Sequence, residues 1–177
     1  MNIMFRLFSY WNTYLTEEIR AGKHLDKAQK TDFKTFFDKI TFNQQNQWAI
    51  LWVEQDVVYW GKVDQQKVDK SCFFRTNKQA IEQNFAALEV TKKQSLLQIL
   101  EQYIGDFLDG IDGCISTIES MDYEKVRITT EAAFLITLVV QLSTQSTGLG
   151  AVPFLESASF ALVVHSSNFD LIKIERV

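Results

Sequence analysis

The chain has 177 residues, of which 46% are hydrophobic, and it carries a net charge of −4. This length and apolar content suffice for one globular domain over residues 1–177 and exclude a disordered chain. The acidic balance excludes a protein that is basic overall, so we expect no nucleic-acid partner. The longest apolar stretch, residues 132–140, has about half the length of a membrane-spanning helix, so we expect no membrane partner.

The first elements expected along the chain are two helices. Residues 3–20 carry apolar side chains at helical spacing, at Met4, Leu7, Phe8, Trp11, Leu15 and Ile19. Gly22 is the expected end of this helix. We interpret it as part of the fold and not as a secretion signal, because Arg6 interrupts the apolar run and no small-residue cleavage site follows. A one-sided stripe of Phe and Ile predicts a second, short helix over residues 33–40.

A change of composition at residue 48 predicts strands. The segment WAILWVEQDVVYWGKVD is β-branched and aromatic, and it indicates two strands joined around residues 54–56. SCFFRT predicts a third strand. A period of two places Trp48 and Trp52 on one face, with Trp60 on the partner strand. Such aromatic pairs can stack nucleobases or sugars, but they more often form the core between a sheet and a helix.

The second half of the chain is expected to be mainly helical. Thr76 and Thr91 each begin a stretch with capping-box spacing, which predicts helices over residues 77–88 and from residue 92 onward. Residues 132–142 are apolar on nearly every side, which predicts a helix buried on all faces. Two strands around residues 166–168 close the chain. The fold class predicted is α+β, with a mainly antiparallel sheet of about five strands packed with about five helices.

The stretch DFLDGIDGCISTIES, residues 106–120, resembles a calcium loop at first sight. An EF-hand loop needs oxygen ligands at positions 1, 3 and 5, glycine at position 6 and glutamate at position 12. With Gly113 at position 6, Asp112 and Glu119 fit, but Leu108 and Gly110 occupy positions 1 and 3. The stretch is therefore not a calcium loop, and we expect neither a bound metal nor a cofactor.

A long helix fits this region better. Its apolar residues advance by threes and fours without a phase break, at Leu97, Leu100, Ile104, Phe107, Leu108, Ile111, Ile115 and Ile118. This pattern predicts one helix over residues 92–120, although Gly105, Gly110 and Gly113 each weaken it by roughly 1 kcal/mol relative to alanine. The carboxylates fall outside the apolar stripe, on one flank and the back of the predicted helix.

The charge of this region is one-sided. Residues 94–124 contain seven acidic residues and no lysine or arginine. Because the whole chain carries −4, the remaining residues sum to +3. Like charges three or four residues apart destabilise a helix by about 0.2–0.5 kcal/mol per pair, as at Asp106, Asp109 and Asp112. Because this charge pattern destabilises the helix locally, we interpret the acidic face as a surface that binds a partner. The alternatives are a solvated acidic face and a metal site.

The docking interpretation assigns specific residues to the partner. The candidate partner-binding residues are Glu101, Asp106, Asp109, Asp112, Glu119 and Asp122. The expected partner is a protein with a basic surface, such as a toxin domain or a nuclease. An acidic face steers association with such a surface.

No catalytic signature stands out in the sequence. Cys72 and Cys114 are too few for a disulfide framework, and we interpret them as buried free thiols of a cytoplasmic protein. Cys72 and His165 form a thiolate–imidazole pair only if folding joins them. The leading hypothesis is a non-catalytic protein-binding module, most concretely an immunity-type inhibitor of a basic toxic enzyme. The alternatives are an enzyme with a non-motif active site and a subunit of a larger assembly.

Overall fold

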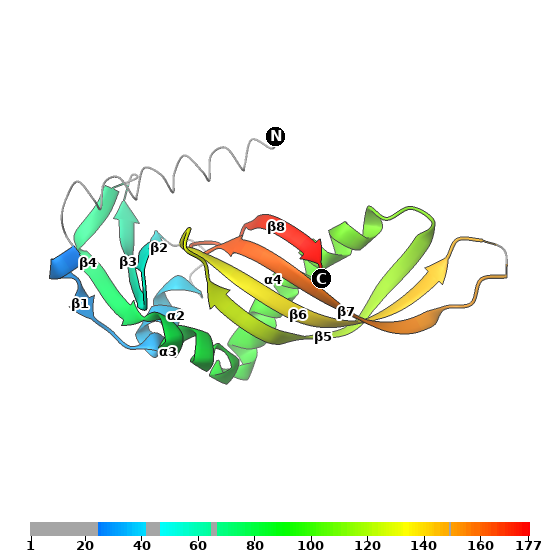
Figure 1. The fold of residues 1–177 in the computed structure, drawn as a ribbon, viewed down its shortest axis with the longest axis horizontal. Coiled ribbons are helices and arrows are strands. Elements are labelled where there is room, and N and C mark those ends of the chain that lie inside the picture. The colour runs from blue at the N-terminus through cyan, green and yellow to red at the C-terminus, as the bar shows by residue number, and fades with distance from the viewer. Residues whose placement is uncertain (1–24, 42–46, 65–66, 149) are drawn as a thin grey trace.

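A computed structural model of the chain describes residues 25–41, 47–64, 67–148 and 150–177 (Figure 1). Its helical elements are η1 (Leu25–Lys27), α2 (Phe33–Ile40), α3 (Lys78–Asn84), η2 (Phe85–Ala87) and α4 (Val90–Asp109). Its strands are β1 (Gln29–Lys30), β2 (Trp48–Glu54), β3 (Val57–Asp64), β4 (Lys67–Asn77), β5 (Cys114–Ile128), β6 (Ala133–Ser146), β7 (Phe154–His165) and β8 (Leu171–Arg176). The helix predicted over residues 3–20 lies outside the described residues.

The α+β class is confirmed, but the predicted proportions are wrong. The strands divide into two four-stranded sheets, one mixed and one antiparallel. The described residues form three α-helices, not about five. No helix in these ranges is long and apolar enough to cross a membrane.

The first sheet has the strand order β1-β4-β3-β2. Strand β1 runs parallel to β4, and the other pairs are antiparallel. The predicted hairpin over residues 48–64 and the predicted third strand are confirmed as β2, β3 and β4. The predicted helix over residues 33–40 is α2, and Asp32 caps it by accepting a 2.8 Å hydrogen bond from the backbone N–H of Thr35.

The two tryptophans of β2 do not share a face. A register shift between Ile50 and Trp52 breaks the alternation of side chains along the strand. Trp48 therefore packs toward the larger core cluster, 5.7 Å from the ring of Trp60, whereas Trp52 packs against the smaller cluster on the other face. The prediction of a common face is wrong, because a strict period of two holds only for a regular strand.

The second sheet is an antiparallel meander of β5, β6, β7 and β8 in sequence order. Residues 132–142, predicted as a buried helix, belong mostly to the inner strand β6, so that prediction is wrong. An apolar run of this kind is equally compatible with a strand that has neighbours on both sides. The β-branched side chains of Ile136, Val139 and Val140 favour the strand.

Helix α4 ends at Asp109, and the predicted helix over residues 92–120 is wrong in its last third. The backbone N–H of Gly110 caps the helix by donating to the carbonyl oxygens of Phe107 and Leu108. Gly113 then adopts a φ of +84°, a left-handed conformation that glycine reaches without steric cost. These two glycines turn the chain, and β5 begins at Cys114.

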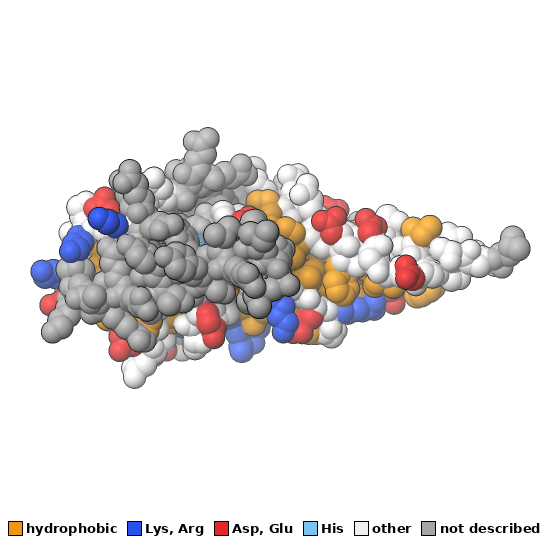
Figure 2. All heavy atoms as spheres, turned by 90° about the horizontal axis from the view of Figure 1, so that it is seen from above, with side chains coloured by type: hydrophobic (Ala, Val, Ile, Leu, Met, Phe, Trp, Pro, Cys, Tyr) orange, Lys and Arg blue, Asp and Glu red, His pale blue; other side chains and the backbone are white. Residues whose placement is uncertain are grey.

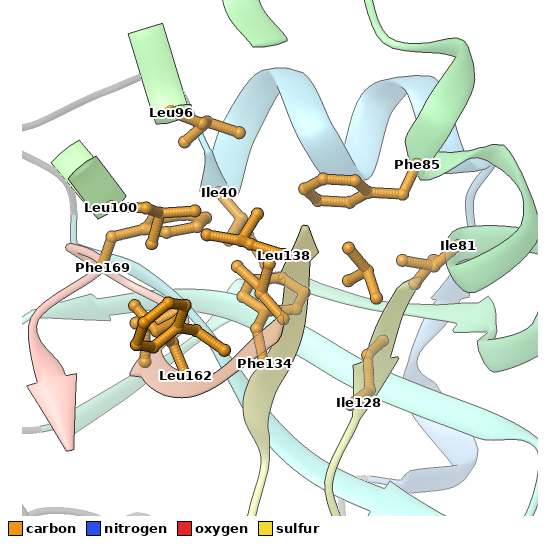
Figure 3. Close-up of a cluster of buried hydrophobic side chains, with 14 of the residues drawn as sticks. Ile40, Ile81, Phe85, Leu96, Leu100, Ile128, Phe134, Leu138, Leu162 and Phe169 are labelled. Atoms are coloured by element: carbon orange, nitrogen blue, oxygen red, sulfur yellow. The ribbon is translucent and has the colours of Figure 1, made fainter. Parts of the chain in front are cut away.

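The larger hydrophobic cluster joins the helices to both sheets. Figure 3 shows side chains from α2, η2, α4, β6 and β7 that converge on one another. The ring of Phe36 lies 5.4 Å from that of Trp60 in the first sheet and 6.3 Å from that of Phe134 in the second. The indole Nε1–H of the fully buried Trp60 donates to Thr76 Oγ1 across 2.8 Å, which satisfies its one polar group.

Candidate functional site

The acidic residues predicted to lie on one flank and the back of a single helix are distributed over three elements. Glu101, Asp106 and Asp109 lie on α4, and Asp112 lies in the turn after it. Glu119, Asp122 and Glu124 lie on β5. Because the chain reverses between α4 and β5, the two elements lie side by side and leave a space between them.

That space is an open groove of about 600 Å³ between α4 and the first half of β5. Its walls come from α4 at Gln98, Glu101, Gln102, Gly105 and Leu108, and from β5 at Ser116, Thr117 and Ile118. Glu101 is the charged residue of this lining, and amides and hydroxyls supply most of the other polar groups. Figure 2 shows acidic side chains along the tapering half of the molecule, into which the second sheet extends.

Helical geometry places the other carboxylates of α4 relative to the groove. Taking Glu101 as zero at 100° per residue, Gly105 lies at about 40° and Asp109 at about 80°, so Glu101 and Asp109 flank Gly105. Asp106 lies at about 140°, on the side of α4 turned away from the strand. On β5, Glu119 follows the groove residue Ile118 at a register shift, and it is not among the residues that line the groove. Glu101 and Asp109 therefore border the groove, whereas Asp106 and Glu119 do not.

Asp122 differs from the other predicted site residues. Its Oδ1 lies 3.4 Å from Nζ of Lys93, in the first turn of α4, and it does not line the groove. The nearby ring of Tyr123 packs on Phe85, and burial, followed by the charge of Asp122, raises the pKa of the Tyr123 phenol. Asp122 thus contributes to the contact between β5 and the N-terminal part of α4, and not to the groove.

The remaining predicted carboxylates have no cationic partner among the described residues. Within the described part of the chain, Glu101, Asp106, Asp109, Asp112 and Glu119 form no ion pair. All five are exposed. Lys92 and Lys93, the nearest cations before them in sequence, are already engaged by Asp38 and Asp122. The groove therefore carries negative charge that the described fold does not neutralise.

Gly105 is the groove residue that sequence reasoning treated only as a helix weakener. A Cβ atom added to it meets no heavy atom within 4 Å, so no neighbour requires a glycine there. Glycine inside a helix costs about 1 kcal/mol relative to alanine. Its position between two carboxylates leaves the wall of the groove open at that point.

The β5 wall was also missed, because residues 114–118 were assigned to a helix. Two signals could have found it. The dipeptides Asp109-Gly110 and Asp112-Gly113 are strong turn signals. The residues that follow are rich in Ile and Thr, which favour strands over helices.

His165 and Ser167 are the other polar contact of chemical interest. The backbone N–H of Ser167 donates to His165 Nδ1 across 3.1 Å, and the Ser167 hydroxyl also contacts Nδ1. Burial lowers the pKa of His165 to about 4, so the ring is neutral at neutral pH. Ser167 is buried, and both its hydroxyl and its own backbone N–H contact the same ring nitrogen, Nδ1 of His165. The contact therefore closes the β7–β8 turn and presents no nucleophile to solvent.

The cysteines and metal ligands offer no alternative site in the described residues. Cys72 and Cys114 are half-buried free thiols, so the prediction of buried thiols is wrong. Cys72 lies on β4 of the first sheet, whereas His165 ends β7 of the second, and no hydrogen bond between these two described residues joins them. Among the described residues, no three His, Cys, Asp or Glu side chains gather closely enough to hold a metal ion.

The groove between α4 and β5 is thus the feature from which a function can be argued. Its properties are an open volume, uncompensated carboxylates and a wall left open at Gly105. Comparison with protein-family models, with curated proteins and with solved structures finds no match to the chain.

Proposed function

We propose that the protein is a non-catalytic binding module that captures a basic protein partner in the groove between α4 and β5. The observation that carries this proposal is the cluster of carboxylates around the groove without a cation. Glu101 lines it, Asp109 borders it, Glu119 follows the groove residue Ile118 in sequence, and residues 94–124 contain no lysine or arginine. Uncompensated charge of this kind attracts a cationic surface from a distance and accelerates association.

The most specific form of the proposal is an immunity-type inhibitor that neutralises a basic toxic enzyme. Such a protein needs a rigid scaffold and an acidic surface that blocks a cationic active site, and it needs no catalytic residues. The core shared by the helices and both sheets supports the first requirement. The exposed carboxylates at the groove support the second.

The test compares two variants of equal net charge. In the groove variant, Glu101, Asp109, Asp112 and Glu119 are changed to lysine. In the control variant, the exposed acids Asp26, Glu54, Asp56 and Glu89, which do not line the groove, are changed to lysine. The partner is isolated by co-purification from native extract and identified by mass, and association rates are then measured over a range of ionic strength.

The groove variant should associate at least tenfold more slowly than the wild type at low salt, and its rate should depend less on salt. The control variant should retain most of the salt dependence. Equal association rates for the wild type and the groove variant at low salt would exclude the acidic groove as the binding site. An isolated partner that the protein binds without inhibiting would exclude the immunity form alone.

A further inference from the structure

The edge of strand β5 that borders the groove pairs with no other strand among the described residues. Strand β5 is an edge strand, hydrogen-bonded to β6 on one side. The backbone N–H of Thr147 donates to the carbonyl of Gly113, which makes residues 113 and 147 a hydrogen-bonded pair. Such pairs alternate along an antiparallel ladder, so Ile115 and Thr117 direct their backbone groups toward β6. Cys114, Ser116 and Ile118 direct theirs away from it.

These outward groups have no backbone partner within the described chain. The register is regular from Cys114 to Ile118 and shifts only after Ile118. Five regular residues correspond to about 17 Å of strand, close to the usual length of a strand in a globular protein. This stretch therefore offers a ready edge for one more strand.

Two other sheet edges in the described part of the chain carry features that discourage pairing. The N–H of Ile50 on the edge strand β2 donates to Ser166 Oγ across 2.9 Å. Strand β8 has six residues and carries Lys173 and Arg176, charges that discourage edge pairing. The first half of β5 has no lysine, arginine or proline. It also lies beside the groove with uncompensated negative charge.

We propose that the groove binds its partner as an added β-strand: an extended segment of the partner pairs with the edge of β5 at residues 114–118. This inference rests on the proposed function and specifies the form of the partner. Hydrogen bonds to Ser116 and Ile118 supply affinity that does not depend on sequence. The side chains of the added segment, which alternate between its two faces, supply the selectivity.

The two faces define the chemistry of the segment. A residue of the added segment that lies opposite Ser116 points to the same face as Ser116. This face is covered by α4, so the side chain of that residue lies near Glu101 and the open position at Gly105. A long basic side chain fits there. Residues between these positions point to the other face, beside Ile115, whose side chain is 66% exposed. The segment therefore alternates lysine or arginine with apolar, β-branched residues.

Charge also selects against a second copy of this chain at the same edge. Two copies paired through β5 bring the carboxylates of both grooves together, with no cation in residues 94–124 to offset them. Like charges brought close together at an interface repel one another and disfavour association. A basic segment from another protein gains the attraction that a second copy lacks.

The test uses capped peptides in which lysine alternates with valine, long enough to span residues 114–118. One peptide is unmodified, one carries N-methyl groups on its lysines, and one carries them on its valines. All three have the same charge, but each methylated peptide has lost the N–H groups of one edge. Neighbouring strands of the second sheet are antiparallel throughout, so we expect the peptide to pair with β5 in the same way. A lysine opposite Ser116 then directs its backbone N–H toward β5, and methylation of the lysines is expected to block pairing.

The protein variants are Ser116→Pro, Ser116→Ala and Glu101→Lys. The proline removes an N–H that points away from β6, so the ladder to β6 is retained. The alanine is its control, since it removes the same hydroxyl, which lies 3.0 Å from Thr144 Oγ1. Amide hydrogen exchange of the wild type supplies a readout that does not depend on substitution.

We expect the unmodified and valine-methylated peptides to bind the wild type, with binding at least tenfold weaker for the lysine-methylated peptide and for Ser116→Pro. Bound peptide should slow exchange at the Ser116 and Ile118 amides but not at Thr117, which is already bonded to β6. Equal binding of both methylated peptides, reduced by Glu101→Lys, overturns the added strand and leaves the proposed function standing. No binding of any peptide overturns both. Self-association of the wild type that Ser116→Pro abolishes overturns the choice of occupant.

Discussion

The backbone N–H of Ile50 donates to the side-chain oxygen of Ser166 across 2.9 Å, and this hydrogen bond joins the two sheets of the protein. Ile50 lies on β2, at the edge of the first sheet, and Ser166 lies in the turn between β7 and β8 of the second. Both residues are almost completely buried, at 3% and 1% exposure. The second sheet thus satisfies a donor that would otherwise be left without a partner at the edge of the first.

Substitution of Ser166 by alanine should destabilise the protein by about 1–3 kcal/mol, because the buried N–H of Ile50 then lacks an acceptor. The measurement is the free energy of unfolding in denaturant. The control is Ser157→Ala, which removes an exposed hydroxyl that accepts from Gln141 Nε2 across 3.1 Å. That change should shift stability by less than about 0.5 kcal/mol. Equal effects of the two substitutions would contradict the role assigned to Ser166.

The stability of the protein should fall as the pH is lowered through the range in which His165 titrates. Burial lowers the pKa of His165 from 6.5 to about 4, so below pH 6.5 the unfolded chain binds a proton that the folded protein excludes. The contribution is complete above pH 6.5, declines toward about pH 4 and amounts to no more than about 3 kcal/mol.

The measurement is the difference in unfolding free energy between the wild type and His165→Gln at a series of pH values. Every other titrating group is common to both proteins, so the difference isolates His165. The wild type should lose stability relative to the variant as the pH falls. A difference that does not change with pH would show that His165 keeps an ordinary pKa in the folded protein.

Gly105→Ala should raise the stability by about 1 kcal/mol, because alanine is the better helix former and its Cβ meets no neighbour within 4 Å. For a chain of this size the melting temperature should rise by roughly 2–4 °C. Gly113→Ala is the opposite control, since its φ of +84° places a side chain in the left-handed region and should cost roughly 1–2 kcal/mol. A loss of stability in Gly105→Ala would show that the groove wall has no room for a methyl group at this position.

The two half-buried cysteines should report separately on the two sheets. Both should react with a thiol reagent in the native protein, more slowly than in the unfolded chain. A lysine–valine peptide bound at β5 should slow labelling of Cys114, which begins that strand, and leave the rate at Cys72 on β4 unchanged. Mass analysis of the labelled sites gives both rates in one experiment. Equal protection of both thiols would indicate a general stabilisation and not occupation of the groove.

Local sequence patterns correctly predicted the elements that depend mainly on residues nearby in the sequence. The hairpin over residues 48–64, helix α2 and the final hairpin all follow from periodicity and turn residues. The helix over residues 92–120 was extended too far, because Ile111, Ile115 and Ile118 continued the helical spacing by coincidence. Residues 132–142 failed for another reason: the partners on both sides of β6 decide that it is a strand, and they come from distant parts of the sequence.

The candidate site was predictable in its charge but not in its shape. The absence of lysine and arginine from residues 94–124 identified the acidic region directly. The groove requires that α4 and β5 face each other, which follows from the turn at Gly110 and Gly113. The helical prediction placed Glu101 and Glu119 on one flank, whereas the fold separates them: Glu101 lines the groove on α4, and Glu119 lies on β5 outside the groove lining. Asp122 was assigned to the same set because sequence distance gave no sign of its contact with Lys93.

The shared core also sets an order for biosynthesis. The first sheet is complete once residue 77 has left the ribosome, and Phe36 can then pack on Trp60. Phe134, which packs on Phe36 from the second sheet, is synthesised more than fifty residues later. Until then the nascent chain displays aromatic side chains that the finished protein hides, and such surfaces are prone to aggregate. A ribosome-bound chain that stops before β6 should therefore bind chaperones, and the release of those chaperones should coincide with the emergence of β6 and β7.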